Sequence, residues 1–436
     1  MSALFFIFYG KFNMILIEQR KDDVMSLLIS QFRDKVSKLK DYKMKVETEY
    51  NVGYPTGYLA VDFRNGMVVT SKLPDGNTFK YYSIGIADGS LCMFIGRSGC
   101  GKTTWLLQAA GNIIRPFENS CIFYDDIEGG ATDARTLNMT GLDPDEAHRR
   151  IIHRNTGITA ENLYARIKMI SDMKLDNRSD YEYDTGLYDN NGNRVYKLQP
   201  TVYIVDSWAL LMPGTYTDED EVSGQMSATA TARQNAAILK RIIPLLKASN
   251  IILFIINHIN QKVEINPMMH SKAQVSYLKQ GETLPGGNAA IYLSNNIFRF
   301  DNGTKLKEKD TFGIDGEIVD VTLVKSRSNK AGQSVPLVFN QEEGFDPDLS
   351  LLVFLKDRGR LGGAGAYLCI DIAPDIKFSQ RNFKQKLYEN SDLMAAFNEV
   401  ALEELKTMLS DQGNSSINRT SASATNQILN MIKPAA

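Results

Sequence analysis

The feature that most constrains the fold is a series of continuous apolar runs with amphipathic segments between them. The run "IILFII" (251–256) contains no polar residue, which is typical of a strand that is buried on both faces of a sheet. The sequence predicts strands at 91–95, 120–124, 201–205, 251–256, 291–300 and 318–325. Because helical patterns alternate with the earlier runs, we expect an α/β fold with a mostly parallel, twisted sheet flanked by helices.

The rest of the chain divides around this core, which we place at 51–345. Residues 1–50 are predicted to form an N-terminal arm with an exposed amphipathic helix at 25–45. A polar insertion at 172–200 contains an Asn-Asn-Gly turn and predicts a hairpin, as does "LPDGN" (73–77). A small C-terminal α/β region (346–410) ends in a charged helix, and the low-complexity tail (411–436) is predicted to be disordered.

The opening stretch, "MSALFFIFYGKFNMILI", is apolar but is interrupted by Lys11. It is too short to span a membrane, and it lacks the basic start and the small-residue cleavage site of a signal peptide. Two explanations stay open. Translation starts at Met14 or Met25, or the stretch is an arm that docks on a neighbouring subunit.

Charge and cysteine content narrow the choice of partners and compartment. The formal net charge of -2 provides no general basic field, so any contact with DNA must come from a local patch, and we expect no membrane partner. The 4 cysteines have neither paired nor metal-ligand spacing, which fits a reducing compartment. We therefore expect a cytoplasmic protein.

Residues 96–103, "GRSGCGKT", match the phosphate-binding pattern G-x-x-x-x-G-K-[ST] between a predicted strand and a predicted helix. Glycines let backbone N–H groups turn toward phosphates, and the helix N-terminus adds its dipole. Lys102 supplies a positive charge to the β- and γ-phosphates, and Thr103 supplies a hydroxyl to a Mg²⁺ ion. We expect ATP and Mg²⁺ to bind through Gly96, Arg97, Ser98, Gly99, Cys100, Gly101, Lys102, Thr103, Thr104 and Asp206.

Polar residues that follow three other predicted strands indicate the same site. Asp206 ends "TVYIVD", where a carboxylate can hold the Mg²⁺ opposite Thr103. "CIFYDDIEGG" places Asp125 and Glu128 after another strand, where a carboxylate can orient the attacking water, although a helix-capping role explains Asp125 better. His258 ends "FIINH" and is a candidate sensor of the nucleotide, with a structural histidine as the simpler interpretation.

These motifs occur in an order that resembles the RecA-type recombinases, and the chain looks closest to their phage UvsX-like branch. The shared segments, within residues 50–400, are "YPTGYLAVDF", the phosphate-binding pattern, "FYDDIEGG", "YIVDSW", "FIINH", "LPGGNAAIYLSN", "VTLVKSRSNKAG" and "GFDPDLSLLVFLKDRGRL". The phosphate-binding pattern is generic, whereas Gly286-Gly287-Asn288 combined with Lys325 and Arg327 is specific. The resemblance implies a RecA-like P-loop ATPase core. It also implies that the N-terminal helix is an oligomerisation helix that packs on the adjacent subunit, although packing within the chain explains its apolar stripe nearly as well.

The resemblance also implies catalytic roles for residues outside the phosphate-binding pattern. Glu128 matches the family's water-activating glutamate, and His258 matches its γ-phosphate sensor. Lys325 and Arg327 match the basic pair that reaches into the ATP site of the neighbouring subunit. Cations supplied across an interface neutralise transition-state charge only in the assembled filament, so ATP would hold subunits together. The aromatic residue that stacks on adenine in this family is missing, and Asp133 or a neighbour stands in its place.

Two long connections match the family's DNA-binding loops. The first, 212–227, contains the acidic run 218–221 and is a poor phosphate binder by itself. The second, 260–288, interleaves basic and apolar residues, which can pair with phosphates and stack on the bases of a single strand. Composition alone favours a solvated flexible loop, and only its position in the family order assigns it to DNA. The predicted DNA-binding residues are Lys262, Met268, Met269, Lys272, Lys279, Gly286, Gly287 and Asn288.

We therefore expect a DNA-dependent ATPase that forms filaments on single-stranded DNA and promotes homologous pairing and strand exchange in recombination, repair and recombination-dependent replication. The expected partners are single- and double-stranded DNA, further copies of the chain, and single-strand-binding and mediator proteins. Three alternatives share the ATP site: a ring-forming RecA-fold helicase, a regulatory relative that exchanges no strands, and an ATPase that acts on protein. The intact Lys102, Glu128, Lys325 and Arg327 favour the recombinase over the regulatory relative.

Overall fold

The computed structural model of the chain describes residues 52–189, 192–214, 224–261, 273–306, 316–327, 329–364 and 366–411. The predicted N-terminal arm and its helix lie outside these ranges, as do residues 412–436 of the predicted tail. The chain forms two compact units. Of the described residues, 70–81, 186–189 and 192–195 belong to the smaller unit, and the others belong to the larger unit.

The larger unit is built on a nine-stranded sheet in the order β17-β16-β15-β14-β5-β11-β10-β6-β7. Neighbouring strands from β7 to β14 are parallel, and those from β14 to β17 are antiparallel. The strands are β5 (Leu91–Gly96), β6 (Ile122–Asp126), β7 (Ile151–Arg154), β10 (Thr201–Asp206), β11 (Ile251–His258), β14 (Asn296–Leu306), β15 (Gly316–Ser326), β16 (Ser334–Asn340) and β17 (Gly344–Asp346). The predicted mostly parallel sheet is confirmed.

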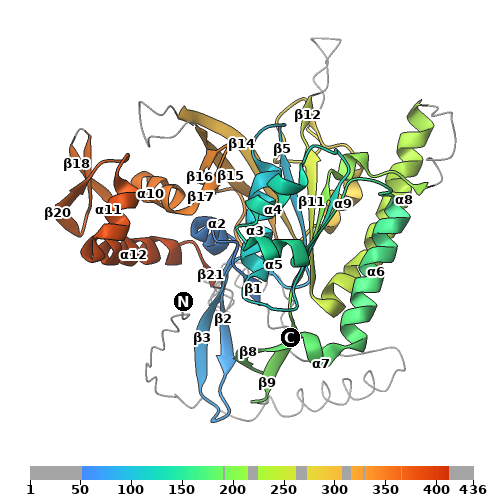
Figure 1. Cartoon of the computed structure of the whole chain (residues 1–436), viewed down its shortest axis with the longest axis horizontal. Coiled ribbons are helices and arrows are strands. Elements are labelled where there is room, and N and C mark those ends of the chain that lie inside the picture. Colours follow the sequence, from blue (N-terminus) through green and yellow to red (C-terminus); the bar gives the residue numbers. More distant parts are fainter. Residues whose placement is uncertain are drawn as a thin grey trace, which may run out of the picture. The chain divides into compact units, whose positions relative to one another are not determined.

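Helices cover both faces of this sheet, and β5 shows why they must. Its residues Cys92 and Phe94 belong to one hydrophobic cluster, together with α3 (Lys102–Ile114). The alternating residues Leu91, Met93 and Ile95 belong to a second cluster, together with residues of α6 (Ala160–Asp176) and α8 (Gly224–Ser249). Successive strand residues point to opposite faces, so a fully apolar strand needs cover on both, and Figure 1 shows the flanking helices.

One predicted strand, 291–300, is wrong in its first part. This part belongs to the helix α9 (Asn288–Leu293), and β14 begins after it. An apolar run of this length fits either element by pattern alone. Residues two positions apart share one face of a strand, yet Ala290 is buried while Tyr292 is 63% exposed. This difference fits a helix and not a strand. The amide and the hydroxyl of Ser294 both donate to the Ala290 carbonyl and so close the last turn.

Short elements complete the structure. The two predicted hairpins are present, as β2 (Met67–Lys72) with β3 (Thr78–Ser83) and as β8 (Glu182–Tyr188) with β9 (Arg194–Leu198). The C-terminal region consists of α10 (Pro347–Asp357), β18 (Leu361–Ala364), β19 (Tyr367–Ile370), β20 (Ala373–Phe378), α11 (Phe383–Glu389), the predicted charged helix α12 (Ser391–Lys406) and β21 (Ser410–Asp411). The remaining elements are β1 (Gly53–Tyr54), α2 (Leu59–Arg64), β4 (Ile86–Ala87), α4 (Asp133–Met139), α5 (Pro144–Arg150), α7 (Arg178–Tyr181), η1 (Trp208–Leu210), β12 (Asn260–Gln261) and β13 (Glu282–Thr283). In the described part of the chain, every helix is too short or too polar to cross a bilayer.

Asp62 is a fully buried carboxyl group in α2, within the segment "YPTGYLAVDF". Its oxygens accept hydrogen bonds from the Thr56 amide, at 2.9 and 3.1 Å, and from the Thr56 hydroxyl, at 2.7 Å. Burial raises the pKa of Asp62 to about 7, although the hydrogen bonds from Thr56 act to lower it. The group therefore closes the turn before α2, but its ionisation opposes folding.

We expect Asp62→Asn to flatten the pH dependence of stability between about pH 4 and about pH 7. The folded protein keeps the Asp62 proton up to a pH of about 7, whereas the unfolded chain releases it near the ordinary pKa of 3.8. The contribution of Asp62 to the free energy of unfolding therefore falls by about 4 kcal/mol as the pH rises through this window, and it is constant above it.

Chemical denaturation of both proteins across this pH range measures the difference. The exposed residue Asp145 provides the control, since Asp145→Asn should keep the wild-type slope. An Asp62→Asn protein with the wild-type slope would contradict the role of the buried carboxyl group.

Candidate functional site

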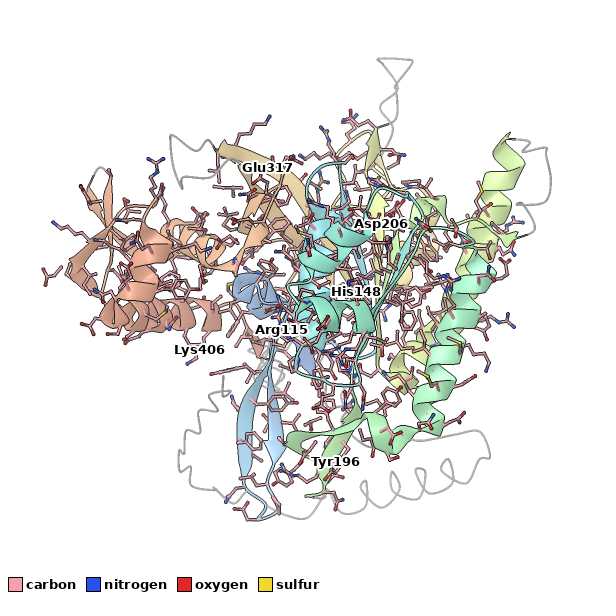
Figure 2. All side chains as sticks on the ribbon, viewed as in Figure 1. Arg115, His148, Tyr196, Asp206, Glu317 and Lys406 are labelled. Atoms are coloured by element: carbon pink, nitrogen blue, oxygen red, sulfur yellow. The ribbon has the colours of Figure 1, made fainter. Side chains whose placement is uncertain are left out.

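The predicted residues of the 96–103 loop come together with Glu128, Asp206 and His258 at the carboxyl ends of four parallel strands, β5, β6, β10 and β11. The register aligns them, because His258 in β11 lies opposite Gly96 in β5 and Asp206 in β10 lies opposite Asp126 in β6. Asp206, labelled in Figure 2, is the last residue of β10. This edge of an open parallel sheet is where α/β proteins bind their ligands.

The loop 96–103 joins β5 to α3 and has the backbone of an anion-binding loop. Gly99 and Gly101 have φ angles of 80° and 79°, which side-chain-bearing residues rarely adopt. A Cβ atom on Gly99 would meet nothing within 4 Å, so the loop is open at that point. Gly101 immediately precedes α3 and has no side chain to cap it, which leaves the first N–H groups of the helix for an anion.

Lys102 is buried beneath this loop. Its side-chain nitrogen Nζ donates to the carbonyl oxygens of Gly96, at 3.1 Å, and Arg97, at 2.7 Å. Main-chain acceptors therefore hold the ammonium group where a phosphate would meet it. Cys100 is buried as well, and burial raises the pKa of its thiol. The rest of the predicted phosphate-binding set is divided between the exposed Arg97, Ser98 and Gly99 and the buried Thr104.

Thr103 and Asp206, the predicted metal ligands, are in direct contact. The Thr103 hydroxyl donates to Oδ2 of Asp206 at 2.6 Å, and the Tyr124 hydroxyl lies 3.5 Å from the same oxygen. Burial raises the pKa of Asp206 to about 6, the hydrogen bond from Thr103 opposes this, and the charges of Glu128 and Asp126 add to the increase. Hydroxyl and carboxylate oxygens are ligands that Mg²⁺ prefers, so the pair fits the predicted ion.

Glu128 and His258 form a second pair at this edge, although they come from different parts of the chain. Nε2 of His258 lies 2.6 Å from Oε1 of Glu128, and their side chains are 26% and 36% exposed, respectively. Ligand atoms of Glu128, Asp206 and His258 all lie within 4.8 Å of one another. The amide of Glu128 donates to the Asp206 carbonyl at 3.2 Å, which holds the loop in place. A carboxylate that is oriented by an imidazole and open to solvent can accept a proton from water.

The two aspartates that end β6 have structural roles, but the helix-capping role predicted for Asp125 is wrong. Asp125 is buried, and its Oδ2 accepts hydrogen bonds from the Tyr203 hydroxyl, at 2.6 Å, and from Arg166 of α6, at 2.5 Å. A buried ion pair therefore takes the place of the predicted cap. Asp126 accepts from two amides of the following loop, both at 2.9 Å, and so shapes the segment that presents Glu128.

His153 is a site residue that the sequence did not predict. Its ring stacks on Tyr124 with centroids 5.0 Å apart, and its Nδ1 lies 2.5 Å from Oδ1 of Asp133. Its Nε2 lies 3.8 Å from Asp126. The signal in the sequence is the run "IIHR" of β7, whose 4 residues are too few to identify a strand by pattern. Asp133, the residue at the predicted adenine position, is therefore in contact with an imidazole.

The described parts of the second predicted DNA-binding connection are residues 260–261 and 273–288. Lys279 and Asn288 are exposed within it, and Oδ1 of Asn288 accepts a hydrogen bond from Gln274 at 2.6 Å. Residues 215–223 of the first connection lie outside the described residues, as do four predicted DNA-binding residues of the second, Lys262, Met268, Met269 and Lys272.

Gly286 and Gly287 lie where this connection reaches the edge of the sheet. Their φ angles are 83° and 81°, and a Cβ atom on Gly286 would lie 2.8 Å from the Trp208 ring. Nδ2 of Asn257, in β11, donates to the carbonyl of Pro285 at 2.8 Å. The glycines therefore permit a close approach of the connection to the ends of β10 and β11, next to the 96–103 loop.

Lys325 and Arg327 lie away from the 96–103 loop of their own chain. Lys325 in β15 pairs with Ile297 in β14, which pairs with Met93, three residues before Gly96 in β5. The Lys325 ammonium donates to the last carbonyl groups of α9, at 2.8 and 2.9 Å, and Arg327 donates to one of them at 3.1 Å. Burial and the charge of Arg327 lower the pKa of Lys325. Both cations therefore lie toward the opposite end of the sheet from the site.

Comparison with known proteins identified no family, since neither a family model nor a curated protein matched the chain. The function is therefore inferred from the chemistry of the residues at the site. Three features lie at one edge of the sheet. The open glycine loop with its buried lysine suits a nucleoside triphosphate, and the hydroxyl–carboxylate pair suits a divalent cation. The carboxylate–imidazole pair suits an activated water.

We expect Lys102→Ala to weaken the binding of Mg²⁺-ATP by at least about tenfold, because it removes the positive charge held inside the loop. Titration with a fluorescent ATP analogue measures the change. Lys356→Ala, which removes an exposed lysine of α10, is the control and should bind like the wild type. Equal affinity of Lys102→Ala and the control would exclude the 96–103 loop as the phosphate site.

Proposed function

We propose that this chain is an ATP-dependent DNA recombinase of the RecA type, similar to the phage UvsX-like proteins, with a RecA-like P-loop ATPase core. The observation that carries the proposal is the meeting of five features at one edge of a parallel sheet. They are the 96–103 loop, the Thr103–Asp206 pair, the Glu128–His258 pair and the two ends of the connection 260–288. A nucleotide site that adjoins a nucleic-acid loop is what a DNA-dependent ATPase requires.

Each residue of the site then has a role in ATP hydrolysis. The amides of the 96–103 loop and Lys102 hold the β- and γ-phosphates. Thr103 and Asp206 hold Mg²⁺, which neutralises phosphate charge when it is bound. Glu128 accepts a proton from the attacking water, and His258 orients its carboxylate from 2.6 Å away. Because β11 ends at His258 and the second connection follows at once, this histidine also links the γ-phosphate to the DNA-binding connection.

The position of Lys325 and Arg327 supports a role in the neighbouring subunit. Lys325 lies three residues along the strand direction from the level of Gly96. That offset is about 10 Å at roughly 3.3 Å per residue, directed away from the ATP site of the same chain. A head-to-tail filament brings one end of a subunit against the opposite end of the next. ATP then joins subunits through these cations, and hydrolysis weakens the contact.

In this proposal the protein forms filaments on single-stranded DNA in the cytoplasm, pairs the strand with a homologous duplex and exchanges strands during recombination, repair and replication. Single-strand-binding and mediator proteins are further proposed partners. With a net charge of -2, affinity for DNA depends on local residues such as Lys279 rather than on the whole surface, and salt should weaken it.

Two inactive variants should restore part of each other's activity. We expect Lys102→Ala and Arg327→Ala each to lose most DNA-stimulated ATP hydrolysis, but in a mixed filament some interfaces join an intact Lys102 to an intact Arg327 of the next subunit. Random mixing of equal amounts makes about one interface in four intact, so the mixture should reach about a quarter of the wild-type rate. ATP hydrolysis at saturating single-stranded DNA is the measurement.

Each variant alone, at the same total concentration, provides the baseline for this experiment. Arg327→Ala should still bind ATP as a monomer, because Arg327 lies outside the ATP site of its own chain. A mixture that stays at the baseline would contradict a site shared between subunits, and so would an Arg327→Ala protein with a normal rate.

A further inference from the structure

A buried ion network outside the proposed ATP site involves Arg299 of β14, which is 5% exposed. Its guanidinium donates two hydrogen bonds to the carboxylate of Glu282, at 2.7 and 3.0 Å, and two to that of Asp301, at 2.7 and 2.9 Å. A further hydrogen bond, at 3.1 Å, goes to the carbonyl of Tyr277. Every N–H group of the guanidinium therefore has an acceptor, an arrangement that a lysine could not reproduce.

Glu282 belongs to the second predicted DNA-binding connection and is 2% exposed. It begins β13, which pairs with β12 so that Glu282 lies opposite Gln261. The two ends of the connection are therefore joined to each other at Glu282. Burial acts to raise the pKa of Glu282, but the hydrogen bonds from Arg299 and the Lys279 amide outweigh it and hold that pKa below its usual range. The carboxylate is charged and fixed in place.

Arg299 lies next to the strand that leads into the 96–103 loop. In the parallel pairing of β14 with β5, Arg299 lies opposite Ile95 and Phe300 lies opposite Gly96. On the other side of β5, His258 lies opposite Gly96, and the amide of Ile259 donates to the Gly96 carbonyl at 3.2 Å. The base of the connection is thus attached to both neighbours of β5, through β12 to β11 and through Glu282 to β14.

Stability alone does not explain such a network, because a well-packed apolar pair of similar volume is often as stable as a buried ion pair or more so. A bidentate contact between two planar groups adds a defined geometry instead. Through this contact, Glu282 of the connection is joined directly to β14.

We propose that the Glu282–Arg299 pair transmits the binding of DNA at the connection 260–288 to the 96–103 loop and thereby couples DNA binding to ATP hydrolysis. Both are positioning residues, since neither lies at the site of the phosphates or the attacking water. This inference rests on the proposed function and adds a second route from DNA to ATP beside the one through His258.

The test measures ATP hydrolysis by the full chain, without DNA and with increasing amounts of single-stranded DNA. Glu282→Gln keeps the shape of the side chain but removes its charge, and Arg299→Lys keeps the charge but loses the two-pronged contact. Asp301→Asn is the matched control, because it changes the other carboxylate that is bound to Arg299. The Asp301 side chain is 39% exposed and lies outside the connection.

For Glu282→Gln and Arg299→Lys, the ratio of the rate at saturating DNA to the rate without DNA should fall by about tenfold, a common size for coupling between two sites. The DNA concentration that gives half of the effect should change by less than about threefold, since the pair does not bind DNA itself. Asp301→Asn should keep the wild-type ratio.

Equal ratios in all variants would overturn the proposal. A loss of DNA affinity with full stimulation at saturation would also overturn it, because the pair would then only shape the DNA site. A wild type that hydrolyses ATP without any response to DNA overturns the proposed function and the coupling with it, and this failure is read from the wild type alone.

Thermal unfolding shows which variants are folded. If Arg299→Lys or Glu282→Gln does not fold, the double variant Glu282→Leu/Arg299→Met replaces the pair by apolar side chains and leaves no unpaired charge within it. It should show the same tenfold loss of stimulation, to within about a factor of three. Full stimulation in the double variant would overturn the proposal.

Discussion

The structure depends on the parallel pairing of β5 with β11 on one side and with β14 on the other. These two registers place Gly96 between His258 and Phe300, and the same alignment brings the ends of β6 and β10 to one edge. Because β5 has no polar position, it must be buried on both faces, which requires helices on both sides of the sheet. The helix that follows it, α3, starts at this edge and presents its uncapped N-terminus there. The proposed phosphate site is thus a consequence of how the central strand is buried.

Three buried polar groups of the larger unit differ in how they are stabilised. Burial raises the pKa of Asp62 to about 7, so this carboxyl group stays protonated below that pH. Asp206, with a pKa of about 6, is ionised at neutral pH and accepts a hydrogen bond from Thr103, a state that suits a cation. Arg299 is neutralised by two carboxylates. Asp62 stabilises a turn, whereas the other two lie where the proposed function needs a metal ligand and a rigid contact.

Much of the fold and of the site could be predicted because it is encoded locally. The phosphate-binding pattern lies within eight consecutive residues, and Asp206 and His258 each end an apolar run, so strand pattern alone places them at one edge. The helix α9 could not be predicted, because its short apolar run fits a strand equally well. His153 and the Glu282–Arg299 pair could not be predicted either. His153 of β7 contacts Asp133 of α4, 20 residues away, and Glu282 of β13 contacts Arg299 of β14, 17 residues away. No local pattern in the sequence indicates either contact.

The central claim is that ATP bound at the 96–103 loop drives the assembly of a DNA-binding filament. The most direct test is steady-state ATP hydrolysis with and without single-stranded DNA, combined with negative-stain electron microscopy of the same samples. The account predicts strong stimulation by DNA together with helical filaments. Stimulation with closed rings would indicate a helicase, and hydrolysis that does not respond to DNA, with neither filaments nor rings, would contradict the account.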